Sequence, residues 1–338
     1  MSGENALQTL RSAATWIGVA AGVLVLWEIR DALLLGLGAI LAAIFLRFIM
    51  DLICRATGLP DAVALSVAVL FMIAVFALCF WLFGMRLSTQ FVEVGHHIRE
   101  GEKSFAALLG PAAQGAIQRA LSLVGDAVPV FLSMGIEFLE FAVITAIAAI
   151  YLAAQPEIYR RGAAALFPRS VRAKALETLD LIGASLRLWL MGQLILMFSV
   201  GVLSYVAALT VGLPNPVALG LIAGVTEMIP YLGPFIGGVP AVLVALTRGL
   251  MPALWILIAY VFVHMFEGYL VGPLLQRWFV RIPPALVLIA IVASQMLFGV
   301  PGIILAAPLI VVIYTATKFL YVGATLKQHV DLPTEAPF

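Results

Sequence analysis

The chain has 338 residues, of which 63% are hydrophobic and only 11% are charged, and its formal net charge is +1. A soluble domain typically carries about 25% charged residues, so the surplus of apolar surface predicts an all-helical, polytopic membrane protein in contact with a lipid bilayer. The near-neutral charge excludes a protein that binds nucleic acid by neutralising phosphates, and the two cysteines, Cys54 and Cys79, form no metal or disulfide motif.

Residues 1–85 are predicted to form the membrane helices of an N-terminal scaffold. The chain is uncharged between Arg11 and Glu28 and again between Asp31 and Arg47. Because both runs are short, they predict a tight helical hairpin whose flanking arginines reach toward the membrane surface. Residues 62–85 carry no charge and predict the clearest spanning helix.

Residues 86–130 are rich in charged side chains and predict an amphipathic segment outside the membrane, on the extracytoplasmic side. Their spacing at Glu93, His96, His97 and Glu100 could bind a metal, but a solvated helical face is the preferred interpretation. No metal site and no cofactor is therefore predicted.

Residues 131–187 predict a fourth spanning helix, over 131–154, and then a polar loop over 155–187. Glu137 and Glu140 share one face of that helix and are interpreted as an interfacial face. The loop is rich in Lys and Arg, which places it in the cytoplasm. Both chain termini, including a tail over 327–338, then also lie in the cytoplasm. The basic residues of the loop are Arg160, Arg161, Arg169, Arg172, Lys174 and Arg187.

Residues 188–326 predict a transport region that begins with an apolar span over Leu188–Val211. It contains two similarly punctuated stretches, 213–243 and 282–312, that align at an offset of 68 residues. Clusters of Gly and Pro should break a helix in the middle of each stretch. In the first stretch, arms of about 12 to 15 residues span roughly 20 Å, too little to cross a hydrocarbon core of about 30 Å. The returning arm of the second stretch could continue as a full helix to about Lys327. The fold class expected is therefore about six spanning helices plus two re-entrant hairpins in an inverted repeat. The alternative is eight spanning helices with kinks. The breaking residues are Pro230, Gly233 and Pro234 in the first stretch and Gly299, Pro301 and Gly302 in the second.

Two motifs in these stretches resemble signatures of a known family. Residues 227–240 read EMIPYLGPFIGGVP, which is similar to the pattern IPYxGPxxGxxP of the AI-2E transporter family. Residues 298–309, FGVPGIILAAPL, resemble its second signature, FGxxGxxxAxP. The resemblance implies a secondary transporter of the bacterial inner membrane that exports a small polar solute such as autoinducer-2. It also implies a homo-oligomer, such as a pentamer, with a scaffold and a hairpin-bearing part that moves in an elevator-like way. Other members are described as antiporters of sodium and protons.

Ionisable groups inside spanning segments are costly unless they are paired or solvated, so each is a candidate for the solute or ion path. Glu227 lies beside the first break, where it could bind a proton, a cation or a substrate hydroxyl, or could serve as a structural cap. Glu267 follows His264 by three residues on one helical face. It could be a proton or cation ligand, or it could form a pair with His264 near the interface. The neutral hydrogen-bonding candidates are Gln193, Thr226, Ser294 and Gln295; the repeat aligns Thr226 with Ser294 and Glu227 with Gln295.

The chain contains no nucleotide-binding loop and no HExxH or GxSxG motif, which argues against ATP-driven transport by this chain and against an enzyme. A secondary transporter of a small polar solute is the leading prediction. A sodium/proton antiporter is the first alternative, because two carboxylates lie in the transport region. A passive channel, or a non-transporting membrane partner that makes contacts through residues 86–126, is the second alternative.

Overall fold

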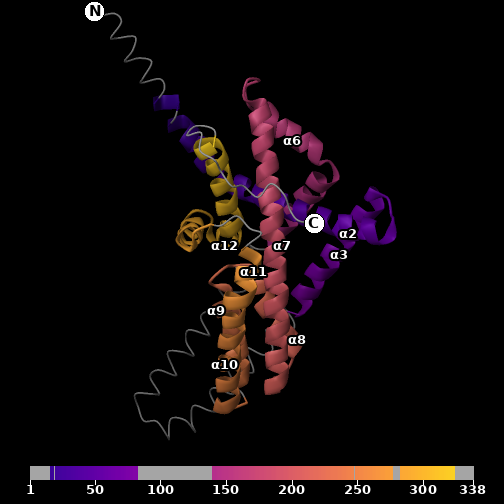
Figure 1. Cartoon of the computed structure of the whole chain (residues 1–338), viewed down its shortest axis with the longest axis vertical. Coiled ribbons are helices and arrows are strands. Elements are labelled where there is room, and N and C mark those ends of the chain that lie inside the picture. The colour runs from indigo at the N-terminus through magenta and orange to yellow at the C-terminus, as the bar shows by residue number, and fades with distance from the viewer. Residues whose placement is uncertain (1–15, 19, 83–138, 247, 277–281, 324–338) are drawn as a thin grey trace, which may run out of the picture.

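The computed structural model describes residues 16–18, 20–82, 139–246, 248–276 and 282–323. All regular elements in these ranges are helices (Figure 1), as the composition predicts. The segment 86–130, with its Glu93, His96, His97 and Glu100, lies outside the described residues, and so do Glu137 and the tail over 327–338.

The predicted tight hairpin near residue 30 is wrong. The Ile29 amide donates to the Val25 carbonyl and the Leu33 amide donates to the Ile29 carbonyl, so the helical pattern continues from the first apolar segment into α2 (Arg30–Thr57). The helix also passes through Arg47, whose Nε donates to the Ala153 carbonyl at 2.9 Å. It ends at Gly58, which has φ 70°, and α3 (Asp61–Leu82) follows, beginning where the uncharged run predicts.

The polar loop predicted over 155–187 is also wrong, because most of it is helical. The helix over Leu139–Ala154 bends by 94° into α6 (Pro156–Ala165). The next helix, α7 (Arg172–Val211), has 40 residues and is about 60 Å long. Its charged first part extends the span predicted over Leu188–Val211. Arg160 pairs with Asp180 at 2.7 Å and joins α6 to α7, so the charges of this region lie on helix surfaces.

Two interruptions divide the C-terminal half, at the predicted Gly and Pro clusters. α8 (Pro216–Thr226) and α9 (Gly233–Leu246) are separated by residues 227–232. α12 (Pro284–Thr317) contains Gly299 in a non-helical conformation, and Figure 1 shows its two arms running in different directions. Between the interruptions, α10 (Leu250–Phe266), the π-helix η2 (Glu267–Val271) and α11 (Gly272–Gln276) follow one another directly, and the π-helix η3 (Lys318–Gly323) extends α12.

Apolar packing forms separate clusters along the molecule. One joins α2, α3 and the helix over Leu139–Ala154; another joins α7, α8, α9 and α10. A third packs α2 and α7 against the return arm of α12. Among the described residues, four helices are long and apolar enough to cross a membrane, or five if the bent pair at residue 155 is one span. The chain is therefore a helical membrane protein.

Candidate functional site

The site begins with a close approach between α7 and α8. A Cβ atom on Gly220 would lie 2.7 Å from the Gly201 carbonyl oxygen, and one on Gly224 would lie 2.6 Å from the Met197 carbonyl oxygen. Only glycine permits backbones this close, as in the small-residue interfaces of membrane helices. This seam sets the end of α8 directly against the middle of α7.

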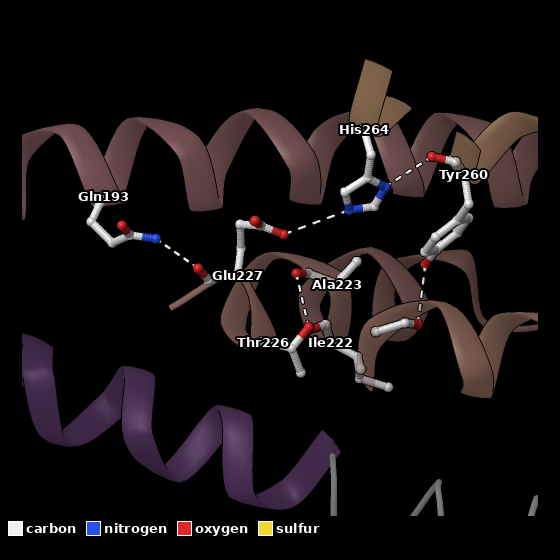
Figure 2. A network of polar contacts seen from close by, with 8 residues as sticks. Gln193, Ile222, Ala223, Thr226, Glu227, Tyr260 and His264 are labelled. Atoms are coloured by element: carbon white, nitrogen blue, oxygen red, sulfur yellow. Dashed lines mark hydrogen bonds and ion pairs between the residues drawn. The ribbon is translucent and has the colours of Figure 1, made fainter. Parts of the chain in front are cut away.

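The chain leaves α8 at Glu227. A side chain of α7 binds the backbone of Glu227 there. Gln193 Nε2 donates to the Glu227 carbonyl at 2.6 Å (Figure 2). Gln193 is 6% exposed and Glu227 is 4% exposed, so this bond is made inside the protein. A helix break leaves carbonyls without their usual donors, and Gln193 satisfies one of them.

The Glu227 side chain points toward α10, where it meets a histidine (Figure 2). Oε2 of Glu227 lies 3.6 Å from Nε2 of His264. The other ring nitrogen, Nδ1, is 2.8 Å from the Tyr260 carbonyl oxygen. A carbonyl can only accept, so Nδ1 carries a proton and donates it there. Tyr260 in turn donates its hydroxyl to the Gly237 carbonyl of α9 at 3.4 Å.

Glu267 completes the cluster from the first residue of the π-helix η2. One oxygen of each carboxylate and one nitrogen of His264 all lie within 4.8 Å of one another. Short π-helical segments inside α-helices occur frequently at functional sites. We name Glu227, His264 and Glu267 the acidic cluster.

The remaining predicted site residues lie elsewhere or have structural roles. The Thr226 hydroxyl donates to the carbonyls of its own helix, Ile222 at 2.9 Å and Ala223 at 3.1 Å. Ser294 is buried on the first arm of α12 against Gly302 of the second arm, whereas Gln295 is exposed. Glu227 and Gln295, aligned by the repeat, therefore do not occupy equivalent environments. Glu140 is exposed at the start of its helix.

The predicted breaking residues occupy different places around the two interruptions. Pro230 lies within the first interruption, but Gly233 and Pro234 already belong to the first turn of α9. In α12 the interruption is Gly299 itself, with φ 65° and ψ −141°, whereas Pro301 and Gly302 lie in the returning arm.

Sequence reasoning noted His264 beside Glu267 but missed its contact with Glu227, and it missed Tyr260 altogether. Tyr260, His264 and Glu267 recur at intervals of four and three residues, the spacing of one helical face, in an otherwise apolar segment. Polar residues on one face of a spanning helix point to a protein partner rather than lipid. That signal could have placed this face of the helix against protein, although it does not identify the segment that it contacts.

The acidic cluster can bind a cation, or a solute with hydrogen-bond donors. The groups that it offers to a ligand are acceptors: two carboxylates and the Nε2 atom of a neutral imidazole. Among the described residues, neither Oε2 of Glu227 nor Nε2 of His264 has a hydrogen-bond partner. Buried acceptors of this kind favour a positively charged or donating ligand.

Comparisons with known proteins identify the family of the chain. The family model described as "AI-2E family transporter" matches residues 15–321. The chain is 32% identical to the "Putative transport protein YrrI" of Bacillus subtilis over 212 residues, 62% of this chain and 55% of that protein. It is 30% identical to "Putative transport protein YueF" of the same organism, over 44% of this chain and 40% of that protein.

The chain thus spans about half the length of these two curated relatives. A "Putative transport protein" of Thermotoga maritima is 24% identical over 303 residues, 87% of this chain and 92% of that protein. The family model covers both helix interruptions and the acidic cluster. The chain therefore belongs to the AI-2E family of membrane transport proteins.

Proposed function

We propose that this chain is a secondary transporter that exports a small polar solute, such as autoinducer-2, across the bacterial inner membrane. The observation that carries the proposal is the burial of Glu227 at a helix interruption, with its carboxylate turned toward His264 and Glu267. Polar groups and broken helices at membrane depth are tolerated where they line a cavity or a ligand site, and secondary transporters are built around such features.

In this proposal the two interruptions are the tips of re-entrant hairpins. The 11 residues of α8 and the 14 of α9 are about 16 and 21 Å long, shorter than the hydrocarbon core of about 30 Å. In α12, Gly302 of the second arm comes into contact with the Ser294 carbonyl, so the chain folds back at Gly299. An inverted arrangement of the two hairpins, with the basic region 155–187 in the cytoplasm, accounts for the charge distribution.

The separate apolar clusters suggest which parts move. The cluster of α2, α3 and residues 139–154 forms the scaffold, and the cluster of α7 to α10 carries the site. Movement of the second against the first would carry the solute in an elevator-like way. The scaffold would also join copies of the chain into a homo-oligomer such as a pentamer. Small residues permit close packing between helices of different copies. Of the small residues in the first helices, Gly18, Gly22 and Gly36 have open space beside them and could make such contacts, whereas Ala39 and Ala43 are already buried within the chain.

A second candidate is exchange of sodium, or another monovalent cation, for protons. The observation that favours it is the presence of two carboxylates, Glu227 and Glu267, in one cluster. A channel is less favoured, because channels more often use filters arranged symmetrically about one axis than paired helix breaks.

The test is solute movement in proteoliposomes with an imposed gradient of pH or of sodium. We expect autoinducer-2 to accumulate against its own gradient in liposomes containing the protein, and Glu227→Gln to reduce this accumulation. Protein-free liposomes are the control. Sodium movement with no solute movement would favour the second candidate. If autoinducer-2 or sodium moves at a rate that does not depend on the imposed gradient, the protein is not a coupled carrier. If neither moves, the result contradicts a transport function.

A further inference from the structure

Two buried acceptor atoms face each other in the acidic cluster. Because Nδ1 of His264 donates to the Tyr260 carbonyl, the lone pair of a neutral imidazole is on Nε2. That lone pair faces Oε2 of Glu227 at 3.6 Å, and within the described part of the chain neither atom has a hydrogen-bond partner. A buried acceptor left unsatisfied costs about 1 to 3 kcal/mol. A cation held between the two atoms would remove this cost.

Glu267 adds a third donor atom to the same point. Its carboxylate oxygen, the Glu227 oxygen and the His264 nitrogen all lie within 4.8 Å of one another. A shared proton bridges two atoms, whereas a metal ion uses all three. Two ligands at about 2 Å from a tetrahedral ion lie about 3.3 Å apart, so small side-chain movements would close the cluster around one ion.

The charges favour a divalent ion. Glu227 and Glu267 together carry two formal negative charges, and in the described ranges the ion pair of the cluster involves His264 and no Lys or Arg. A divalent cation would make the site neutral. While both carboxylates stay ionised, a monovalent cation, or a proton on the imidazole, would leave one negative charge among apolar helices, where an uncompensated charge is costly.

We propose that Glu227, His264 and Glu267 bind one divalent transition-metal ion, for which Zn²⁺ is the best match. One imidazole nitrogen and two carboxylate oxygens form a ligand set suited to Zn²⁺, whereas Mg²⁺ and Ca²⁺ take oxygen ligands. The Tyr260 carbonyl orients His264 as outer-shell partners orient metal-binding histidines. Three protein ligands leave a fourth position for water or a hydroxyl of the solute.

The sequence alone predicted no metal site, and this inference revises that prediction. It rests on the proposed function in one respect, that the acidic cluster is the ligand site of the transporter. Metal binding does not require movement of the chain, so it can be measured in detergent, apart from transport.

The experiment titrates Zn²⁺ into the purified full-length protein by isothermal titration calorimetry, after removal of any affinity tag and of bound metal with EDTA. We expect one saturable Zn²⁺ per chain, with no comparable binding of Mg²⁺ or Na⁺. Glu267→Gln and His264→Gln should each weaken binding by about 100-fold or more, since loss of even outer-shell partners costs about 10- to 100-fold. Glu177→Gln, on the exposed surface of α7, is the matched control and should bind as the unaltered chain does.

A second control removes the two adjacent histidines of the chain, by His96→Ala together with His97→Ala. Binding that disappears in this variant, or that persists in both cluster variants, would place the ion elsewhere and overturn the proposal. Visible absorption of bound Co²⁺ provides a readout that folding alone does not change, and size-exclusion profiles identify variants that do not fold. Zn²⁺ binding without transport in liposomes contradicts the proposed function alone, and transport without Zn²⁺ binding contradicts the metal site alone.

Discussion

Nε2 of His264 lies 3.6 Å from Oε2 of Glu227, and this contact joins α10 to the end of α8. Around it, apolar side chains of α7 to α10 pack into one cluster that includes Ala223, Tyr260 and Val263. A change in the position of the α8–α9 pair relative to α10 would separate the two atoms. What binds between them therefore affects which arrangement of these helices is favoured, because a ligand shifts an equilibrium only by binding one state better.

Gln193→Leu tests how the interruption after α8 is held. The variant keeps a side chain of similar size but removes the donor to the Glu227 carbonyl, which is buried. We expect a loss of about 1 to 3 kcal/mol, seen as a lower apparent melting temperature in detergent, together with weaker transport. Ser199→Ala is the control on the same helix, since the Ser199 hydroxyl donates to the Ile195 carbonyl of its own turn. Equal melting temperatures for the two variants would contradict the assigned role.

Gly220→Ala tests the α7–α8 seam. The new methyl group would lie 2.7 Å from both the Gly201 carbonyl oxygen and Cβ of Tyr205, so the helices must separate. We expect a destabilisation of about 1 to 3 kcal/mol, as in other overpacked contacts. Gly183→Ala, with open space beside it inside α7, should instead stabilise the helix by up to about 1 kcal/mol. In thermal shift assays the melting temperature should therefore fall for Gly220→Ala and rise for Gly183→Ala. Changes in the same direction would contradict the close approach of α7 and α8.

Local chemistry made several helix boundaries predictable. The uncharged run from residue 62 marks the start of α3, and α7 ends at Val211, where the predicted span ends. The Gly and Pro clusters mark both interruptions, because these residues disfavour a continuous helix. The charged residues near 30 and over 155–187 misled the prediction, since charges were interpreted as loops although helices readily carry them on exposed surfaces.

The composition of the site depended on contacts that local patterns do not determine. Glu227 and Glu267 could be singled out individually, because a carboxylate in an apolar segment is unusual. Their meeting with His264 requires the packing of α8 against α7 and α10, which the residue spacing leaves open. The 68-residue repeat aligned Gln295 with Glu227, but Gln295 is exposed, so approximate sequence symmetry did not produce equivalent environments.

Gly299→Ala tests the second interruption. Gly299 has φ 65° and ψ −141°, a region that is essentially restricted to glycine. We expect a loss of about 1 to 3 kcal/mol, a lower melting temperature and reduced transport, because the arms of α12 would no longer fold back in the same way. Gly162→Ala in α6, with nothing within 4 Å of the added atom, is the control and should retain transport. A fully active and equally stable Gly299→Ala protein would contradict a required turn here.

The re-entrant topology predicts the side of the membrane from which two positions can be labelled. Arg248 lies between α9 and α10, and the helical run Leu250–Gln276 is about 40 Å long, enough to cross the bilayer. In a background with Cys54→Ala and Cys79→Ala, we expect an Arg248→Cys chain to react with an impermeant maleimide from outside. An Arg277→Cys chain should react from the cytoplasm.

Arg161→Cys provides the reference for this experiment, because Arg161 is exposed on α6 within the basic region expected in the cytoplasm. It should react in inside-out vesicles and stay unreactive in intact spheroplasts. If the α8–α9 pair instead crosses the membrane as one span, Arg248→Cys will share the labelling pattern of Arg161→Cys. That result would exclude the first re-entrant hairpin and favour the alternative with eight spanning helices. Labelling of Arg248→Cys from outside, in intact spheroplasts, would support the re-entrant hairpin, which also fits the short arms of α8 and α9.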